Sequence, residues 1–357
     1  MSSVSDSSAS RRPREIFFAL VAATSSLVLL GVSLEVILRV VGVDTPVRRH
    51  FSPGIYQSDD ELGWALAPDY VGAHLEYDGP VPVTTSRLGD RGWRGPAWRG
   101  ARRVAQQRVL ALGDSWTFGR GVPDDATYPV LLEASLRADG HDVAVFNAGV
   151  PGYDTVQEAL VFEQLAQAVR PTLVIVGWLP NDVTERSVTA REGLQVLDGQ
   201  LVHDIERYRA WKHQIEYGGI YRSALYRFLR VRLKRLGGRD RSRWRVSLDD
   251  EALAYSQAPF TRIKRRAEAL GARVLVILSP REEEVAGAAA IDHHERMGAF
   301  VRAQGAGVID LASEWRARGS REGRYLPRDA VHLTSSGYRE VADAIAAHPW
   351  IVAWKKP

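Results

Sequence analysis

Three side chains in this sequence could act together on a carbonyl group: Ser115, Asp329 and His332. A serine hydroxyl is a weak nucleophile at neutral pH, so it needs an adjacent base that removes its proton. The imidazole of His332 can take this proton. Asp329 lies three residues before His332 and could accept a hydrogen bond from the other ring nitrogen, which would fix the tautomer. These residue types predict a serine nucleophile served by a histidine base.

Attack by a serine on an ester would produce an oxyanion, which needs hydrogen-bond donors that are positioned in advance. We expect three donors: the backbone amide of Ser115, the backbone amide of Gly152 and the side-chain amide of Asn181. Gly152 has no Cβ, so its backbone can approach a substrate closely. Losing one such donor typically raises the barrier by about 3 kcal/mol.

These residues need a scaffold, and the sequence from residue 104 onward predicts one. Short apolar runs alternate with amphipathic helical stretches, which is typical of a parallel sheet covered on both faces. The predicted strands cover residues 108–112, 142–146, 172–176, 273–279 and 307–311, and the predicted helices cover about 125–138, 155–169, 250–270, 282–303 and 335–347. The fold class is therefore α/β: a doubly wound, flavodoxin-like parallel sheet of about five strands.

The polar motifs fall where such a sheet binds ligands, beyond the carboxyl ends of its strands. Ser115 follows the first strand, the loop 147–152 follows the second, and Asn181 follows the third. Asp329 and His332 precede the last helix. Each motif alone is common, but their conjunction at strand ends is specific. The alternative that Asp329 and His332 merely cap the final helix is weaker, because Thr334 lies closer to that helix and is a good cap.

The N-terminal region predicts a membrane anchor. Residues 1–15 form a Ser-rich tail that ends with several arginines, and residues 16–34 contain no charge. As a helix this run spans roughly 28 Å, close to the hydrocarbon thickness of a bilayer. A cleaved signal peptide is the alternative, but its apolar core is usually shorter. We expect a transmembrane helix over 16–38, with a cytoplasmic N-terminus and an extracytoplasmic catalytic domain.

The remaining chain divides into three parts. Residues 44–103, rich in Gly, Pro and Trp, predict a membrane-proximal segment that is β-rich or irregular, and residues 104–350 predict the hydrolase domain. A helical insertion is expected at about 183–249. It holds a basic stretch, 222–245, with ten Lys and Arg and one acid, around an amphipathic helix. This stretch could contact an anionic surface, or it could be a lid with a solvated basic face.

Several classes of function are disfavoured by composition. The chain has no cysteine, which excludes disulfides, thiolate nucleophiles and cysteine-bound zinc. Its net charge of +4 comes from the basic stretch alone, so nucleic-acid binding is not expected. The histidines at 203, 213, 293 and 294 show no convincing metal-ligand spacing and are read mostly as surface residues. No cofactor or metal is expected.

These motifs resemble the GDSL, or SGNH, hydrolase family over residues 106–349, apart from the insertion. The resemblance matches the family's block residues to Ser115, Gly152, Asn181, Asp329 and His332. It implies an SGNH-hydrolase fold and the hydrolysis of esters or thioesters.

The chain departs from the family pattern at two places. Trp116 replaces the leucine after the serine, which should affect packing more than chemistry. Leu179 and Pro180 precede Asn181 where a glycine and a variable residue are usual, and proline restricts the backbone there.

The expected function is hydrolysis of acyl esters, acetyl or another short chain, on envelope carbohydrate or lipid, through an acyl-enzyme on Ser115. An O-acyltransferase that uses the same residues on an exported polysaccharide is the first alternative. A non-catalytic envelope binding protein is the second alternative. Such a protein would be expected to lack one of the three catalytic residues. The expected partners are the membrane, through the N-terminal helix, and an acylated small molecule, glycan or lipid.

Overall fold

The computed structural model describes residues 11–43, 49–76, 79–96, 98, 104–183, 194–236, 249–319, 323–327 and 329–354. The chain divides into two compact units. The first comprises residues 1–48, 77–79 and 209–238, and the second comprises residues 49–76, 80–208 and 239–357.

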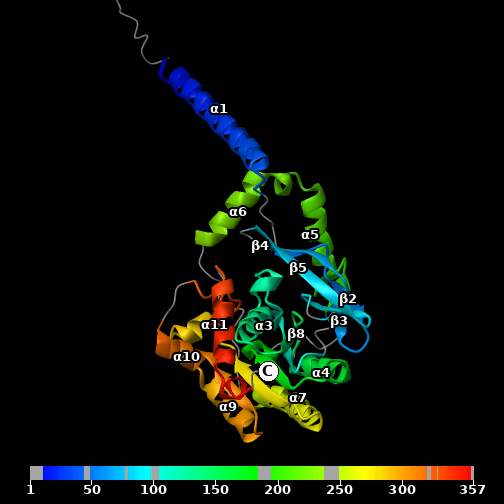
Figure 1. The fold of residues 1–357 in the computed structure, drawn as a ribbon. Helices are drawn as coiled ribbons and strands as arrows, with labels where there is room; N and C mark the ends of the chain where they lie inside the picture. The colour runs from blue at the N-terminus through cyan, green and yellow to red at the C-terminus, as the bar shows by residue number, and fades with distance from the viewer. Residues whose placement is uncertain are drawn as a thin grey trace, which may run out of the picture. The chain divides into compact units, whose positions relative to one another are not determined.

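A five-stranded parallel sheet forms the centre of the second unit (Figure 1). Its strands are β7 (Gln107–Gly113), β8 (Val143–Asn147), β9 (Leu173–Trp178), β12 (Arg273–Leu278) and β13 (Gly307–Asp310). The spatial order β13-β12-β9-β7-β8 is the flavodoxin-like order, in which the chain reverses direction between β8 and β9. The predicted fold class is therefore confirmed, and the carboxyl ends of β7, β8 and β9 are neighbours at one edge.

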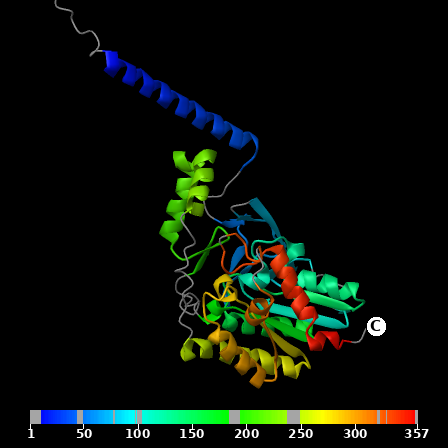
Figure 2. The same cartoon turned by 90° about the vertical axis from the view of Figure 1, so that its left-hand side faces the viewer.

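Side chains of β7 alternate between two separate cores. Val109 and Ala111 pack on one face of the sheet with α3 (Tyr128–Ala138) and α11 (Ser335–Ala346). Leu110 and Leu112 pack on the other face with α4 (Thr155–Val169), α7 (Asp250–Ala269) and α9 (Asp292–Ala303). Figure 2 shows α11, in red, and α7, in yellow, on opposite sides of the sheet. Every β7 residue from 109 to 112 is buried, which explains its continuous apolar run.

One predicted helix is wrong in extent. The stretch 282–303 forms two helices, α8 (Glu282–Val285) and α9, rather than one. Gly287 between them has φ +73°, a left-handed conformation that ends a helix. Arg316 of α10 (Leu311–Arg318) donates hydrogen bonds to the carbonyls of Glu284 (2.6 Å) and Ala289 (2.7 Å). The break is thus fixed by a partner that lies outside the segment.

Residues 49–96 form a second, six-stranded antiparallel sheet with the order β1-β4-β5-β6-β3-β2. The strands are β1 (His50–Ser52), β2 (Tyr56–Asp59), β3 (Gly63–Leu66), β4 (Val71–Glu76), β5 (Gly79–Leu88) and β6 (Arg91–Arg94). Trp64 and Trp93 are buried in the core that also holds Leu110 and Leu112 of β7. This sheet is therefore built onto the face of the hydrolase fold and does not stand apart from it.

The insertion contains a hairpin of β10 (Gln195–Leu197) and β11 (Gln200–Val202), then α5 (Ile205–Tyr217) and α6 (Ala224–Leu236). Residues 184–193 and 237–248, which include part of the basic stretch, lie outside the described residues.

Within the first unit, α1 (Arg11–Val40) contacts α6. Glu35 of α1 accepts hydrogen bonds from the Ser223 hydroxyl (2.8 Å) and from the amides of Ala224 (3.0 Å) and Leu225 (2.8 Å). A carboxylate at this position satisfies the open amides at the start of α6. In α1, Arg14–Val40 is long and apolar enough to cross a membrane, a property that signal sequences share.

Candidate active site

Ser115 lies at a tight strand-to-helix turn. The strand β7 ends at Gly113, and Ser115 begins the short helix α2 (Ser115–Phe118). Asp114 caps this helix by accepting a hydrogen bond from the amide of Trp116 at 2.8 Å. Gly113 has φ +152°, and a Cβ there would lie 2.1 Å from the Thr117 hydroxyl. The Gly-Asp-Ser triplet thus supplies the bend, the cap and the hydroxyl in turn.

The structure brings Ser115, His332 and Asp329 into one hydrogen-bonded series, as the sequence predicts. Ser115 Oγ lies 2.8 Å from His332 Nε2, and His332 Nδ1 lies 2.9 Å from Asp329 Oδ2. All three side chains are buried. This geometry allows the imidazole to accept the serine proton on one nitrogen while the other nitrogen donates to the carboxylate.

Backbone hydrogen bonds hold the loop that carries Asp329 in place. Its Oδ1 atom accepts hydrogen bonds from the amides of Val331 (3.0 Å) and His332 (2.9 Å). Burial alone would raise the pKa of this carboxyl group, but the charge of His332, its hydrogen bonds and the charge of Arg49 hold that pKa well below its ordinary value. Asp329 therefore remains an anion at neutral pH and also under acidic conditions.

Arg49 is a residue of this site that sequence reasoning missed. It directly precedes β1, and its Nη1 atom lies 3.1 Å from Asp329 Oδ2 and 3.5 Å from Glu76 Oε2. Glu76 Oε1 in turn lies 2.7 Å from Nδ1 of the buried His74. Burial lowers the pKa of His74 to about 4, even though the contact with Glu76 opposes this shift. Arg49 is 280 residues from Asp329 in the chain, so no local pattern links them.

The loop after β8 lies against the serine turn. The amide of Val150 donates to the carbonyl of Gly113 at 3.0 Å, and Asn147 Nδ2 donates to the carbonyl of Thr117 at 3.0 Å. A Cβ at Gly149 would lie 2.3 Å from the Phe118 amide nitrogen, so glycine is required for this approach. Gly152 has φ +89°, a conformation that favours glycine, and it follows on the same loop.

The described residues that follow β9 form a 3₁₀ turn, η3 (Pro180–Val183). The Asp182 carboxylate accepts a hydrogen bond from the Leu179 amide at 3.1 Å, and the Asp182 amide donates to the Leu179 carbonyl at 2.9 Å. The side chain of Asn181 lies outside the described residues, so its part in an oxyanion hole stays a prediction.

Trp116, the departure next to the serine, is a packing residue. It is fully buried, with its ring centroid 5.5 Å from that of Tyr128 and 5.9 Å from that of Tyr338. The Tyr338 hydroxyl donates to the Trp116 carbonyl at 2.9 Å, which ties α11 to the serine turn.

The four histidines weighed above as metal ligands divide into two pairs. His203 and His213 are exposed, as expected. The surface interpretation of His293 and His294 is wrong, because they are 3% and 1% exposed and lie among acidic groups. The sequence analysis predicted one amphipathic helix over 282–303 and saw no metal-ligand spacing around these histidines.

Comparison with known proteins identifies a family. The model of the GDSL-like lipase/acylhydrolase family matches residues 111–340. An arylesterase from Vibrio mimicus is 33% identical over 82 residues, which make up 23% of this chain and 41% of the arylesterase, so the match spans less than half of that relative.

Solved structures of similar fold include TesA, at 16% identity and a TM-score of 0.42 over 67% of this chain and 96% of TesA. A catalytic mutant of an acetylxylan esterase from Geobacillus stearothermophilus is 14% identical, with a TM-score of 0.41 over 70% of this chain and 96% of the esterase. The family match covers well over half of the residues and includes the Ser115–His332 pair. The chain therefore belongs to the GDSL-like lipase/acylhydrolase family and is a GDSL-type ester hydrolase.

Proposed function

We propose that Ser115 is the nucleophile, His332 the general base and Asp329 the residue that orients the base. The observation that carries this assignment is the unbroken series of contacts, 2.8 Å from Ser115 to His332 and 2.9 Å from His332 to Asp329. A histidine that only caps a helix would have no reason to face a buried serine hydroxyl. Thr334, moreover, accepts the hydrogen bond from Gly337 that caps α11.

In the proposed reaction, Ser115 Oγ attacks the ester carbonyl carbon while its proton moves to His332 Nε2. The carbonyl oxygen becomes an oxyanion, and His332 then returns the proton to the departing alcohol oxygen. A water molecule attacks the resulting acyl-serine, again losing its proton to His332. The acid is released and Ser115 regains its hydrogen. Asp329 keeps its negative charge throughout and stabilises the imidazolium.

The oxyanion would be held by the amides of Ser115 and Gly152 and by the side chain of Asn181. The hydrogen bond between Val150 and Gly113 supports this grouping, because it keeps the Gly152 loop beside the serine turn. Donors fixed by the backbone need little rearrangement as charge develops, which is the condition for strong stabilisation of a transition state.

The proposed substrates are acetyl or other short-chain esters of envelope carbohydrate or lipid. Ser115 is only 9% exposed, which favours a small acyl group over a bulky one. The envelope assignment rests on the proposed membrane topology. A panel of nitrophenyl esters from two to twelve carbons, with acetylated polysaccharides beside them, tests this specificity. Activity confined to long chains would contradict it, and acyl transfer to an added sugar would favour the transferase alternative.

We propose further that α1 is an uncleaved anchor that leaves the catalytic domain outside the cytoplasm. The contacts between Glu35 and the start of α6 support retention, because cleavage after the apolar run would remove a carboxylate that the insertion uses. A signal peptide has no reason to take part in the mature fold. Carbonate extraction of membranes and protease treatment of spheroplasts test both points. A released, shortened protein would contradict the anchor.

The basic stretch 222–245 is proposed to contact anionic lipid beside that anchor. In its described part, Leu229 and Leu233 are 46% and 64% exposed on α6, next to several arginines. An exposed apolar pair flanked by cations is typical of a helix that lies in a membrane interface. Reconstitution in vesicles with and without anionic lipid, comparing the wild type with Arg227→Gln and Arg230→Gln, tests the contact. Unchanged accessibility of α6 to protease would contradict it.

A further inference from the structure

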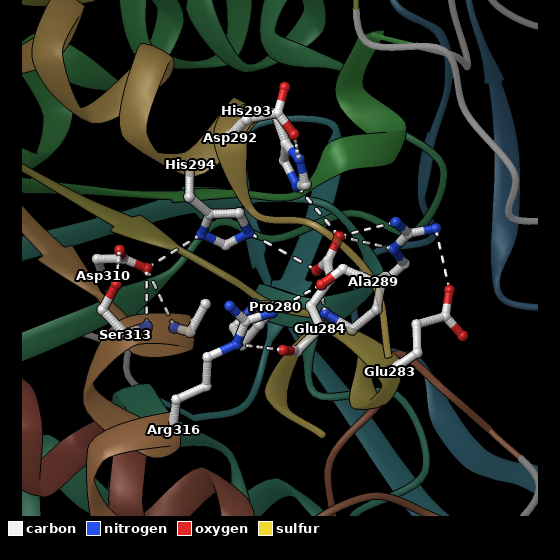
Figure 3. Close-up of polar contacts among 12 residues, drawn as sticks. Pro280, Glu283, Glu284, Ala289, Asp292, His293, His294, Asp310, Ser313 and Arg316 are labelled. Atoms are coloured by element: carbon white, nitrogen blue, oxygen red, sulfur yellow. Dashed lines mark hydrogen bonds and ion pairs between the residues drawn. The ribbon is translucent and has the colours of Figure 1, made fainter. Parts of the chain in front are cut away.

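Three metal-ligating side chains meet in the interior of the second unit, in a place that the ester chemistry does not use (Figure 3). Glu284 comes from α8, and His293 and His294 come from the first turn of α9. Each offers one ligand atom, and these atoms all lie within 4.8 Å of one another. The three side chains are almost completely buried.

The distances between these atoms suit a single small cation. His293 Nε2 lies 3.1 Å from Glu284 Oε1, and His294 Nε2 lies 3.7 Å from Glu284 Oε2. Two ligands bound tetrahedrally at about 2.0–2.1 Å from a zinc ion are about 3.3–3.4 Å apart. The separations of 3.1 and 3.7 Å lie close to that value, and they end on the two different oxygens of Glu284. Within the described part of the chain, neither Nε2 atom has a hydrogen-bond partner. The His293 contact is within hydrogen-bond distance but lacks the direction of a hydrogen bond, and the His294 contact is too long for one.

The surrounding contacts resemble the outer shell of a metal site. His294 Nδ1 lies 3.1 Å from Asp310 Oδ1, and donation of its proton to that carboxylate leaves a lone pair on Nε2. That lone pair would face the buried Glu284 carboxylate. Two electron-rich groups at this distance repel each other unless a metal ion or a further proton on the imidazole supplies positive charge between them.

Arg281 already binds the Glu284 carboxylate. Its Nε and Nη2 atoms donate to Oε1 at 3.0 and 2.7 Å, and its amide donates to Oε2 at 2.7 Å. A carboxylate has about four lone-pair positions, so these bonds orient Glu284 and still leave a position for a further ligand interaction. Metal-bound carboxylates are commonly held in this way.

We propose that Glu284, His293 and His294 bind one divalent cation of the zinc class. Two imidazoles and a carboxylate, with no thiolate, form a donor set that suits zinc. A water molecule would complete the tetrahedron. Because the ligands are buried, the ion would be structural rather than catalytic.

The proposed ion would stabilise two loops of the active site. The amide of Glu282, at the start of α8, donates to the carbonyl of Ala330 at 2.8 Å, inside the loop that carries Asp329 and His332. The ring of Trp178, which ends β9 just before the Asn181 turn, lies 6.3 Å from the His293 ring and 6.2 Å from the His294 ring. An ion that ties α8 to α9 would therefore restrain both loops.

Metal content and spectroscopy test this site. The full chain is purified in detergent with an affinity tag that contains no histidine, stripped with a chelator, and titrated with Zn²⁺ or Co²⁺. We expect about one ion per chain, and with Co²⁺ the intense visible absorption of a tetrahedral complex. A hundredfold excess of Zn²⁺ over its Kd should raise Tm by about 5–10 °C.

The matched variants are Glu284→Gln and His293→Asn, with His213→Asn as the control at an exposed histidine. Each of the first two should weaken Zn²⁺ binding more than tenfold and remove the rise in Tm, whereas the control should behave as the wild type. If the first two variants do not fold, the Co²⁺ spectrum of the wild type still decides the question. The site is overturned if the stripped wild type takes up no stoichiometric ion, or if Glu284→Gln binds as tightly as the wild type. Neither outcome depends on the role of Ser115.

Discussion

Two buried histidines in this protein share one arrangement and differ in what they face. His332 and His294 each place Nδ1 close to an aspartate, at 2.9 Å from Asp329 and 3.1 Å from Asp310. His332 then turns Nε2 toward the hydroxyl of Ser115 at 2.8 Å, while His294 turns it toward the carboxylate of Glu284 at 3.7 Å.

The difference shows that an Asp–His pair is not in itself a catalytic signature. Against a hydroxyl, a neutral imidazole finds a proton to accept, and the pair becomes a base. Against a carboxylate, the same nitrogen finds a negative charge, and the pair can only be completed by a cation or a proton. The third partner decides whether the arrangement performs chemistry or holds the fold together.

The largest expected effect separates the two histidines by activity. Ser115→Ala and His332→Gln should each lower kcat for a short acyl ester by about 10⁴-fold or more, because nucleophile and base act as one unit. Tm should stay within a few degrees of the wild type. Steady-state kinetics and thermal unfolding on the same preparations check this. If Ser115→Ala kept a tenth of the wild-type kcat, activity would no longer distinguish the Ser115–His332 site from the cluster around His294.

The second expected effect is a loss of stability with little loss of activity, and it concerns the cluster of Glu284, His293 and His294. Glu284→Gln leaves the cations around it unbalanced in the interior, and breaking a buried charge network typically costs about 3–5 kcal/mol. We expect a large fall in Tm while kcat of the folded fraction drops less than tenfold. A variant with wild-type Tm and no activity would mean that this cluster takes part in the reaction.

A third buried histidine provides the pH test. The pKa of His74 is about 4 in the folded protein, below the ordinary value of about 6.5, so the unfolded chain binds more protons between these pH values. Stability should therefore fall as pH decreases through this window, by about 2 kcal/mol between pH 7.5 and pH 5.

Urea unfolding of the wild type and of His74→Gln at both pH values measures this contribution. The variant should lose clearly less stability than the wild type. Glu76, whose pKa is also lowered, adds a loss of the same sign at lower pH. An equal loss in both proteins would contradict the assignment to His74.

The smallest expected effect concerns Arg49, which acts on His332 only through its contact with Asp329. Arg49→Gln removes the charge 3.1 Å from the carboxylate that orients His332. We expect kcat to fall about three- to tenfold with little change in KM, and Arg49→Lys to recover part of the loss. A change confined to KM would place Arg49 at the substrate instead.

The sequence predicted whatever depends on local pattern. The strands of the parallel sheet are buried on both faces and read as continuous apolar runs, and Ser115, Asp329 and His332 each sit in a short motif. What it missed depends on distant partners. Arg49 meets Asp329 across 280 residues. Arg316 binds carbonyls on both sides of the break between α8 and α9 from another helix. Neither the Arg49 contact nor the Arg316 contacts can be predicted from a periodicity or a residue spacing in the sequence.

The central claim is that Ser115 is a nucleophile activated by His332. Its most direct test is covalent labelling of the full chain by a fluorophosphonate, followed by mass spectrometry of the digested protein. The account predicts one phosphonyl group per chain on the peptide that contains Ser115, with labelling lost in Ser115→Ala and strongly slowed in His332→Gln. Wild-type protein that stays unlabelled while hydrolysing a short ester, or a Ser115→Ala variant that labels equally well, would contradict it.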